Sequence, residues 1–357
     1  FAGLLASVRP SHAPYKQLRA GLARYRHIDE LGGWPMLPAR DEPLRPGDVH
    51  DDVRLLRERL AIIGEFEGRV ADAGYYRYAD LESSDSRHYG AALKAAVQRF
   101  QRRHLLESDG IIGPQTRTAL NVPVGRRIEQ IRLNMERSRW LLHGLPDTFV
   151  LVDIAGYRLS YFRPNGEVWR SRIVVGQPYR RTPSLRSQIT HLTFNPSWTI
   201  PPTILREDVL PKVRRDLDYL QQANLEVLSP SGEHLDPRRI DWSQPGGVML
   251  RQAPGPNNSL GRVVIRFPND HRGYLHDTPA QQLFGRAQRA FSSGCIRVEN
   301  VLEFARLLFA DDPRLSPGRV DRSLAGDTRS VHLSRPVPVI LHYWTVHVTD
   351  RGELSFR

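Results

Sequence analysis

Apolar positions in the first part of the chain recur at three- and four-residue spacing, the period of an amphipathic helix. Residues 53–63 and 91–100 show this pattern clearly, and a shorter helical run ends at Leu120. Further helices are expected around residues 15–25 and, as one long element, over residues 124–143. The first part of the chain is therefore predicted to be helical, with a polar loop containing Gly and Ser after residue 63.

The pattern changes at Phe149. Short runs rich in Val, Ile and aromatic residues follow, separated by turn residues such as those at 164–166, and this is typical of an antiparallel sheet. A helix over residues 301–309 interrupts the strands, and residues 201–245 carry helix signals and polar loops that indicate an insertion. The expected strands are 149–154, 157–162, 168–175, 189–194, 248–250, 263–267, 274–276, 337–348 and 353–356.

These patterns predict an α+β protein made of four segments. An N-terminal helical scaffold covers residues 1–47 and ends in a proline-containing stretch. A compact three-helix unit covers residues 48–122, and a linking helix covers residues 123–147. The β-rich domain covers residues 148–357, with the helical insertion, which we call the cap, at about 201–245.

Charge narrows the choice of partners. Of the 357 residues, 51 are Lys or Arg and 39 are Asp or Glu, which gives a net charge of +12. Such an excess indicates either a solvated basic surface or attraction to a polyanion, namely nucleic acid, anionic lipid or an acidic wall polymer. Because no helix-turn-helix, zinc-finger or RNA-binding signature occurs, we expect no nucleic-acid partner.

No run of about 18 apolar residues is present, so no membrane-spanning helix is expected. The sequence begins at Phe1 without a signal peptide, and we expect any targeting segment or membrane anchor to have been lost before that residue. The 13 histidines show no metal-ligand spacing, and we predict neither a metal nor a cofactor.

Cys295 is the chain's single cysteine, so no disulfide can form within it. A cysteine nucleophile needs a base and backbone N–H groups that face the developing oxyanion. His276 ends a predicted strand and can supply the base, while the N–H groups of Ser293, Gly294 and Cys295 can form the oxyanion hole. Arg297 adds positive charge that favours a thiolate and attracts a carboxylate.

Each of these residues also has an ordinary structural explanation. A lone cysteine is most often a small buried hydrophobe, and a lone histidine is usually a surface or core residue. Arg297 alone would be a surface charge, and the run of Ser292, Ser293 and Gly294 alone would be a turn. Their combination within one segment favours a catalytic site.

The three-helix unit resembles a peptidoglycan-binding module. The similarity lies in Phe100 and Gln101 and in the turn over residues 109–116, with Gly110 at a tight turn and Pro114 in a first helical turn. The alternative is a helical scaffold that no longer binds its ligand.

The β-rich domain resembles the L,D-transpeptidases, whose catalytic domain is of the YkuD type. The resemblance rests on His276 and Cys295, with 18 residues between them, and on Ser293, Gly294 and Arg297 around the cysteine. Ser293 stands where many members have a second histidine, as in the large periplasmic subtype of the family. Further matches are residues 194–198, 251–256, 260–263 and 267–269.

The resemblance implies roles for individual residues. His276 would activate Cys295, and the backbone carbonyl of Asp277 would orient the imidazole. Tyr274 and Trp198 could equally be core aromatics. The residues expected to line the substrate channel are Trp198, Tyr274, Ser292 and Arg297.

The resemblance also implies a reaction. Cys295 would take an acyl group from the third residue of a tetrapeptide stem, release D-Ala, and pass the acyl group to the diaminopimelate amine of a neighbouring stem, which forms a 3→3 cross-link. Carbapenems would acylate the same thiol. The implied enzyme is a periplasmic monomer. Alternatives are an L,D-carboxypeptidase, a transferase that attaches proteins to the wall, and a non-catalytic wall-binding protein.

Overall fold

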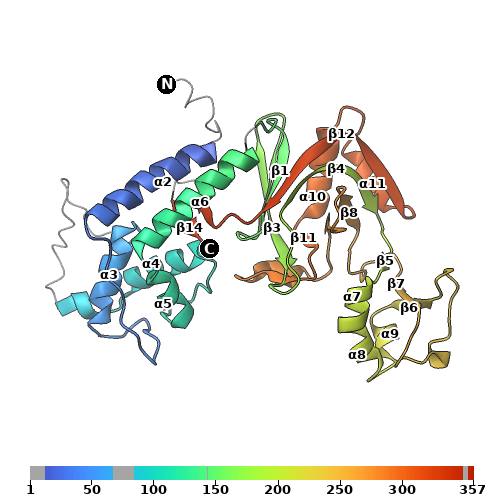
Figure 1. The fold of residues 1–357 in the computed structure, drawn as a ribbon, viewed down its shortest axis with the longest axis horizontal. Coiled ribbons are helices and arrows are strands. Elements are labelled where there is room, and N and C mark those ends of the chain that lie inside the picture. Colours follow the sequence, from blue (N-terminus) through green and yellow to red (C-terminus); the bar gives the residue numbers. More distant parts are fainter. Residues whose placement is uncertain (1–12, 67–83, 143, 349–352) are drawn as a thin grey trace. The chain divides into compact units, whose positions relative to one another are not determined.

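The chain forms two folded units, and both of its ends belong to the first. The computed structural model describes residues 13–66, 84–142, 144–348 and 353–357. The first unit comprises Phe1–Leu145 together with Trp344–Arg357, and the second comprises Pro146–Tyr343. Figure 1 shows the helices of the first unit and the sheet of the second.

The first unit is built around its predicted helices. Their apolar faces form one core that includes the fully buried Leu56, Leu60 and Phe100. The expected loop that follows residue 63 lies partly outside the described residues, as does His143 at the end of the last helix. The helices are α2 Ala13–Glu30, α3 Asp52–Ile62, η1 Ser84–Arg87, α4 Ala91–Arg103, α5 Pro114–Leu120 and α6 Val124–Leu142.

Gln101 explains why the turn between α4 and α5 has its particular sequence. The Gln101 side chain is 1% exposed and donates to Asp109 Oδ1 at 2.8 Å and to Thr116 Oγ1 at 3.2 Å. It also accepts the backbone N–H of Gly110 at 2.8 Å. Gly110 has a φ of +78°, a left-handed conformation that favours glycine. These motif residues therefore hold the fold of the module together.

We expect Gln101→Leu to lower the free energy of unfolding of the helical unit by about 1–3 kcal/mol, because it leaves buried partners without hydrogen bonds. Urea denaturation followed by circular dichroism measures the change. Gln115→Leu, at an exposed position of α5, is the matched control and should stay within about 0.5 kcal/mol of the parent. Equal effects of the two substitutions would contradict this account.

The end of the chain belongs to the helical unit. Sequence analysis placed it in the β-rich domain, with one strand over residues 337–348. In the structure the long strand stops at His342, and β13 Val346–Val348 pairs with β14 Leu354–Phe356. Phe356 packs against Tyr25, with ring centroids 5.4 Å apart. An alternating apolar pattern predicts a strand, but it does not indicate which core buries the strand.

The second unit is a closed sheet with helices packed against it. Nine of the described strands run in the order β10-β3-β11-β9-β8-β4-β12-β1-β2, and a further pairing of β2 with β3 closes the sheet on itself. These strands are β1 Phe149–Asp153, β2 Arg158–Phe162, β3 Val168–Gly176, β4 Leu185–Phe194, β8 Val263–Arg266, β9 Tyr274–His276, β10 Ala290–Ser292, β11 Ile296–Val298 and β12 Arg329–His342.

The sheet is mixed, which corrects the expectation of a purely antiparallel one. β1 runs parallel to β12, and β11 runs parallel to β9. The short strands β10 and β11 flank the cysteine and were not predicted. Helix α10 Val301–Ala310 packs on the sheet (Figure 1). The ring of its Phe304 stacks on that of Trp169, with centroids 5.2 Å apart. Helix α11 Gly318–Leu324 follows it.

The cap is an insertion between β4 and β8 with a small apolar core of its own, in which Leu250 is fully buried. Its three-stranded sheet extends it beyond the predicted 201–245 and includes a strand, β6, that was not predicted. Its elements are β5 Trp198–Thr199, α7 Pro202–Ile204, the π-helical turn η2 Leu205–Val209, α8 Leu210–Val213, α9 Tyr219–Gln222, β6 Leu225–Leu228, η3 Pro237–Arg239 and β7 Met249–Gln252.

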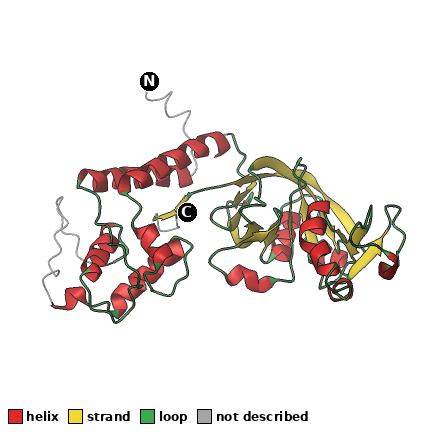
Figure 2. Ribbon diagram, turned by 60° about the horizontal axis from the view of Figure 1, so that its bottom comes forward, coloured by secondary structure: helices red, strands yellow, loops and turns green. Residues whose placement is uncertain are grey.

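Figure 2 separates the helices, strands and loops of both units. Among the described helices, none has the length and hydropathy that a membrane span requires. The described residues also contain no cluster of three or more His, Cys, Asp or Glu side chains that could hold a metal ion. The fold class predicted from the sequence, a β-rich domain with a cap and a helical module, is confirmed.

Candidate active site

A cavity of about 1260 Å³ lies between the closed sheet and the cap. Residues 199–204 of the cap form one wall of it. Seven of the nine predicted site residues line this cavity, while Asp277 and Gly294 lie next to lining residues. The seven are Trp198, Tyr274, His276, Ser292, Ser293, Cys295 and Arg297.

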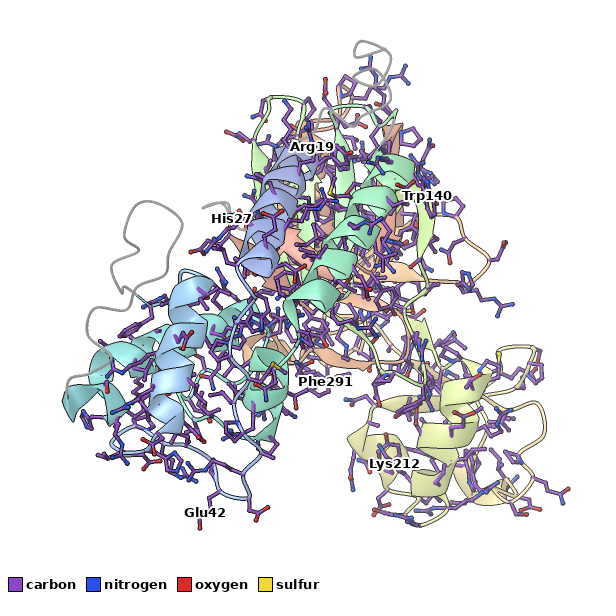
Figure 3. The ribbon with its side chains drawn as sticks, turned by 60° about the vertical axis from the view of Figure 1, so that its left-hand side comes forward. Arg19, His27, Glu42, Trp140, Lys212 and Phe291 are labelled. Atoms are coloured by element: carbon purple, nitrogen blue, oxygen red, sulfur yellow. The ribbon has the colours of Figure 1, made fainter. Side chains whose placement is uncertain are left out.

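Residues 291–295 comprise the end of β10 and its connection to β11, and we call them the nucleophile loop. Phe291 at its start is 41% exposed (Figure 3). Ser292 was predicted to bind substrate, but its hydroxyl is used within the loop, where it donates to the Cys295 carbonyl at 2.5 Å. Gly294 has a φ of +112°, so its backbone conformation requires glycine. The sequence thus supplies the turn that presents the thiol.

The predicted oxyanion hole needs a correction. The Gly294 N–H donates to Ser292 Oγ at 3.2 Å and is therefore directed into the loop. The described residues offer no hydrogen-bond acceptor to the N–H groups of Ser293 and Cys295. Those two N–H groups are the better candidates for stabilising an oxyanion.

Tyr274 contacts the thiol directly. Hydrogen bonding from the Tyr274 hydroxyl and backbone opposes the rise in the pKa of Cys295, and hydrogen bonding from Trp198 opposes the rise in the pKa of Tyr274. The Tyr274 ring also meets the His276 ring edge to face, with centroids 5.6 Å apart. The sequence analysis treated Tyr274 and Trp198 as channel lining or core, and it missed their link to the sulfur.

His276 is held in one tautomer. Its Nδ1 lies 2.5 Å from the Asp277 carbonyl oxygen, which can only accept, so Nδ1 carries the proton and Nε2 has a free lone pair. Burial, reinforced by the charge of Arg297, lowers the pKa of His276 to about 3. The imidazole is therefore neutral at physiological pH and able to accept a proton through Nε2.

The Asp277 side chain fixes the carbonyl that orients His276. Its two carboxylate oxygens accept the backbone N–H groups of Arg262 and Thr278, each at 2.8 Å. Gly261 makes room for this carboxylate, because a Cβ at that position would lie 2.4 Å from it. Asp277 thus positions the imidazole through its backbone, as the family resemblance implied.

Arg297 is a largely buried cation in the cavity. It pairs in register with His276 across β11 and β9, and its Nε finds no hydrogen-bond partner among the described residues. Burial lowers the pKa of its guanidinium, and the nearby Cys295 opposes that shift. A buried cation without a carboxylate partner is expected to bind an anionic ligand.

The sequence analysis missed several cationic residues of the cavity. They share no local motif with the cysteine, since they come from other strands and loops, and the arginines are scattered along a chain rich in that residue. Arg266 stacks on Tyr274, with its guanidinium carbon 4.9 Å from the ring centroid. The missed residues are Arg180, Arg181, Arg266 and Arg272.

The resting thiol is protonated. Burial raises the pKa of Cys295, and the hydrogen bonds from Tyr274 and the charges of Arg266 and Arg297 offset this only in part. We expect alkylation by iodoacetamide to be slow at pH 7 and to increase above about pH 8.5, the ordinary range of a free thiol. Because the chain has one cysteine, the urea-unfolded chain is a matched control. If the folded chain were alkylated faster than the unfolded chain at pH 7, the thiol could not be protonated in the folded protein.

Two family models match this chain. Residues 147–315 match the L,D-transpeptidase catalytic domain, named YkuD, and residues 49–120 match a "putative peptidoglycan binding domain". The fold and the cavity define a two-part protein with a catalytic β-domain and a helical module. Residues 147–315 therefore form a domain of the YkuD L,D-transpeptidase type, as the sequence resemblance indicated.

A "putative L,D-transpeptidase" from Haemophilus influenzae is 32% identical over 227 residues, which are 62% of this chain and 45% of that protein. The chain thus spans about half the length of this curated relative. Solved structures include an L,D-transpeptidase from Stackebrandtia nassauensis, 13% identical, with a TM-score of 0.27 and coverage of 86% of this chain and 96% of that one. Another is the L,D-transpeptidase LdtMt1 in complex with imipenem, 15% identical, with a TM-score of 0.22 and coverage of 55% and 59%.

Proposed function

We propose that the protein is an L,D-transpeptidase that forms 3→3 cross-links between peptidoglycan stems through a thioester on Cys295. The observation that carries the proposal is the position of the thiol. It lies in a cationic cavity with Tyr274 as its hydrogen-bond donor and with the oriented, neutral imidazole of His276 lining the same space. The match to the catalytic-domain family supports the same reaction class.

The first half-reaction is acylation. Cys295 Sγ attacks the carbonyl carbon that precedes D-Ala in the donor stem, and the thiol proton passes to His276 Nε2. The oxyanion faces the N–H groups of Ser293 and Cys295. When the tetrahedral intermediate collapses, the C–N bond breaks and His276 returns the proton to the leaving amine. D-Ala leaves, and a thioester remains on the sulfur.

The second half-reaction transfers the acyl group. The diaminopimelate amine of an acceptor stem attacks the thioester carbon and loses a proton to His276, and the sulfur leaves and is reprotonated. Arg297 would bind a carboxylate of the stem, since it is a buried cation with an unpaired N–H. Water in place of the amine would make the enzyme an L,D-carboxypeptidase, and an amine on a protein would make it a wall-attaching transferase.

Incubation with tetrapeptide-rich sacculi, followed by muropeptide analysis, tests this proposal. We expect free D-Ala and new dimers linked between two third-position residues. Tripeptide monomers without dimers would show trimming instead of cross-linking. Intact tetrapeptides would contradict catalysis and favour a non-catalytic wall-binding protein.

We also propose that the enzyme works in the periplasm as a monomer, because its substrate is the wall polymer. The peptidoglycan-binding match over residues 49–120 supports a role for the helical unit in holding the enzyme on that polymer. Carbapenems are the expected covalent inhibitors, since opening of the β-lactam ring by Cys295 would give an acyl-enzyme.

A further inference from the structure

A stretch of the sheet domain fixes the nucleophile loop from one side. Residues 177–182 follow β3, and the backbone N–H of Gln177 donates to the Ser292 carbonyl at 3.0 Å. The Gln177 side chain donates to the carbonyl one residue earlier at 3.1 Å. Thr182 Oγ1 donates to the Gly294 carbonyl at 2.9 Å. The loop that carries the thiol is therefore placed by its contacts with residues 177–182.

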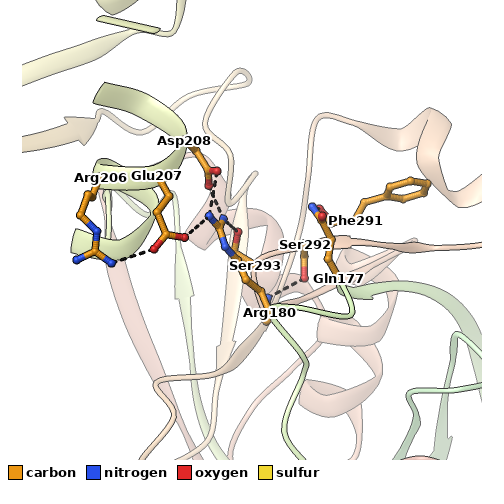
Figure 4. Close-up of polar contacts among 9 residues, drawn as sticks. Gln177, Arg180, Arg206, Glu207, Asp208, Phe291, Ser292 and Ser293 are labelled. Carbon is orange, nitrogen blue, oxygen red and sulfur yellow. Dashed lines mark hydrogen bonds and ion pairs between the residues drawn. The ribbon is translucent and has the colours of Figure 1, made fainter. Parts of the chain in front are cut away.

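Arg180 extends this set of contacts from the nucleophile loop to the cap (Figure 4). Its Nη1 donates to Ser293 Oγ at 2.9 Å. Its Nη2 donates to Glu207 Oε2 at 2.8 Å and to Asp208 Oδ1 at 3.0 Å, while Nη1 also bonds the second oxygen of Asp208. The Arg180 side chain is 13% exposed. One guanidinium thus joins the nucleophile loop to two carboxylates.

Both carboxylates belong to the cap. Glu207 and Asp208 lie in the π-helical turn η2, and π-helical turns frequently occur at functional sites. Residues 199–204, which form a wall of the cavity, directly precede this turn. Loss of the bonds from Arg180 would therefore free that wall of the cavity from the loop that carries the thiol.

The geometry makes this a stronger contact than the exposed ion pair of Arg239 and Asp236 in the cap. Arg180 binds Asp208 with two parallel N–H bonds, the bidentate arrangement that gives strong, directional pairing. Arg239 and Asp236, in contrast, are 88% and 50% exposed and lie 3.6 Å apart within the cap. An exposed pair of that kind contributes little to stability.

We propose that Arg180 is a positioning residue that couples closure of the cap to the placement of the nucleophile loop. The kinetic consequences rest on the proposed function. With Glu207 and Asp208 bound, the cap wall and Ser293 are held together around the cavity, so the stem is enclosed in the orientation that the thiol needs. Without these bonds the cap separates from the loop, and the stem binds more weakly.

Steady-state D-Ala release from a tetrapeptide stem tests the coupling. We expect Asp208→Asn to raise KM by about tenfold with a smaller effect on kcat, because it weakens a charge-assisted pair but leaves the loop contact intact. Arg180→Gln should raise KM and also lower kcat, because it loses both contacts. Arg180→Lys should recover part of the loss. Arg239→Gln makes the same change of charge as Arg180→Gln, at an exposed position on the cap, and should leave both constants unchanged.

Hydrogen exchange followed by mass spectrometry provides a readout that needs no activity. In Asp208→Asn we expect amides of residues 205–213 and 291–295 to exchange several-fold faster than in the parent, with no change in Arg239→Gln. Unchanged exchange would overturn the coupling, and so would faster exchange with an unchanged KM. If the parent protein formed no adduct with imipenem, the proposed function would fail, while exchange would still decide whether Arg180 links cap and loop.

Discussion

Cys295→Ala is expected to abolish covalent modification by imipenem completely. The chain has no second thiol, and its nucleophile would be gone, so incubation should leave the intact mass of the variant unchanged. The parent protein should gain the whole mass of the inhibitor, because opening of the β-lactam ring adds all its atoms to the sulfur. Intact-mass spectrometry measures both outcomes.

Two controls sharpen this test. Cys295→Ser keeps the shape of the site, and we expect it to acylate at least about 10³-fold more slowly, since a hydroxyl beside a neutral imidazole is a much poorer nucleophile than a thiol. Ser231→Ala, at an exposed position of the cap, should react like the parent. Full modification of Cys295→Ala would show that another residue is the nucleophile.

Replacement of His276 should produce the second-largest effect. We expect His276→Gln to slow acylation by imipenem about 10²- to 10⁴-fold, the usual contribution of a positioned general base. Stopped-flow fluorescence or timed quenching with mass analysis measures the rate. A fall of less than about threefold would show that the thiol loses its proton to another group, with Tyr274 as the next residue to substitute.

The pKa of His276 predicts an unusual pH profile. Because burial lowers that pKa to about 3, the imidazole stays neutral between pH 8 and pH 5, and the acylation rate should not fall over this range. An ordinary histidine base would lose activity below about pH 6.5. If the acylation rate fell near pH 6.5 in the parent and also in His276 variants, a group other than His276 would be titrating.

The same pKa has a consequence for stability. In the unfolded chain His276 binds a proton below about pH 6.5, whereas in the folded protein it does so only near pH 3. Stability therefore falls as the pH drops from 6.5 towards 3, and at pH 5 the loss from this residue is about 2 kcal/mol. His276→Gln should lose correspondingly less stability than the parent between pH 7 and pH 5, measured by urea denaturation.

Much of the helical part could be predicted because its signals are local. Pro114 starts α5 in a position where the missing N–H costs nothing, and the apolar spacing of α4 directs Leu93, Val97 and Phe100 into one core. The assignment of residues 344–357 could not be predicted, since the contact of Phe356 with Tyr25 joins opposite ends of the chain.

The site was predicted where its residues are close in sequence. His276 lies on β9 and Cys295 directly precedes the neighbouring strand β11, and the motif that joins them is readable. Arg180 was missed because it reaches Ser293 from a distant loop. The hydrogen bonds of Tyr274 to the sulfur were missed for another reason: they depend on the register of β9 against β11, which no single strand encodes.

The raised pKa of Cys295 also affects how well the thiol resists oxidation. Peroxide oxidises thiolates, and it converts an exposed thiolate first to a sulfenic acid and then, irreversibly, to higher acids. A thiol whose pKa is raised by burial presents little thiolate, and the chain contains no second cysteine that could trap it as a disulfide. The thiol is thereby protected against oxidation, and in the proposed mechanism it would become reactive when a substrate carbonyl lies against it.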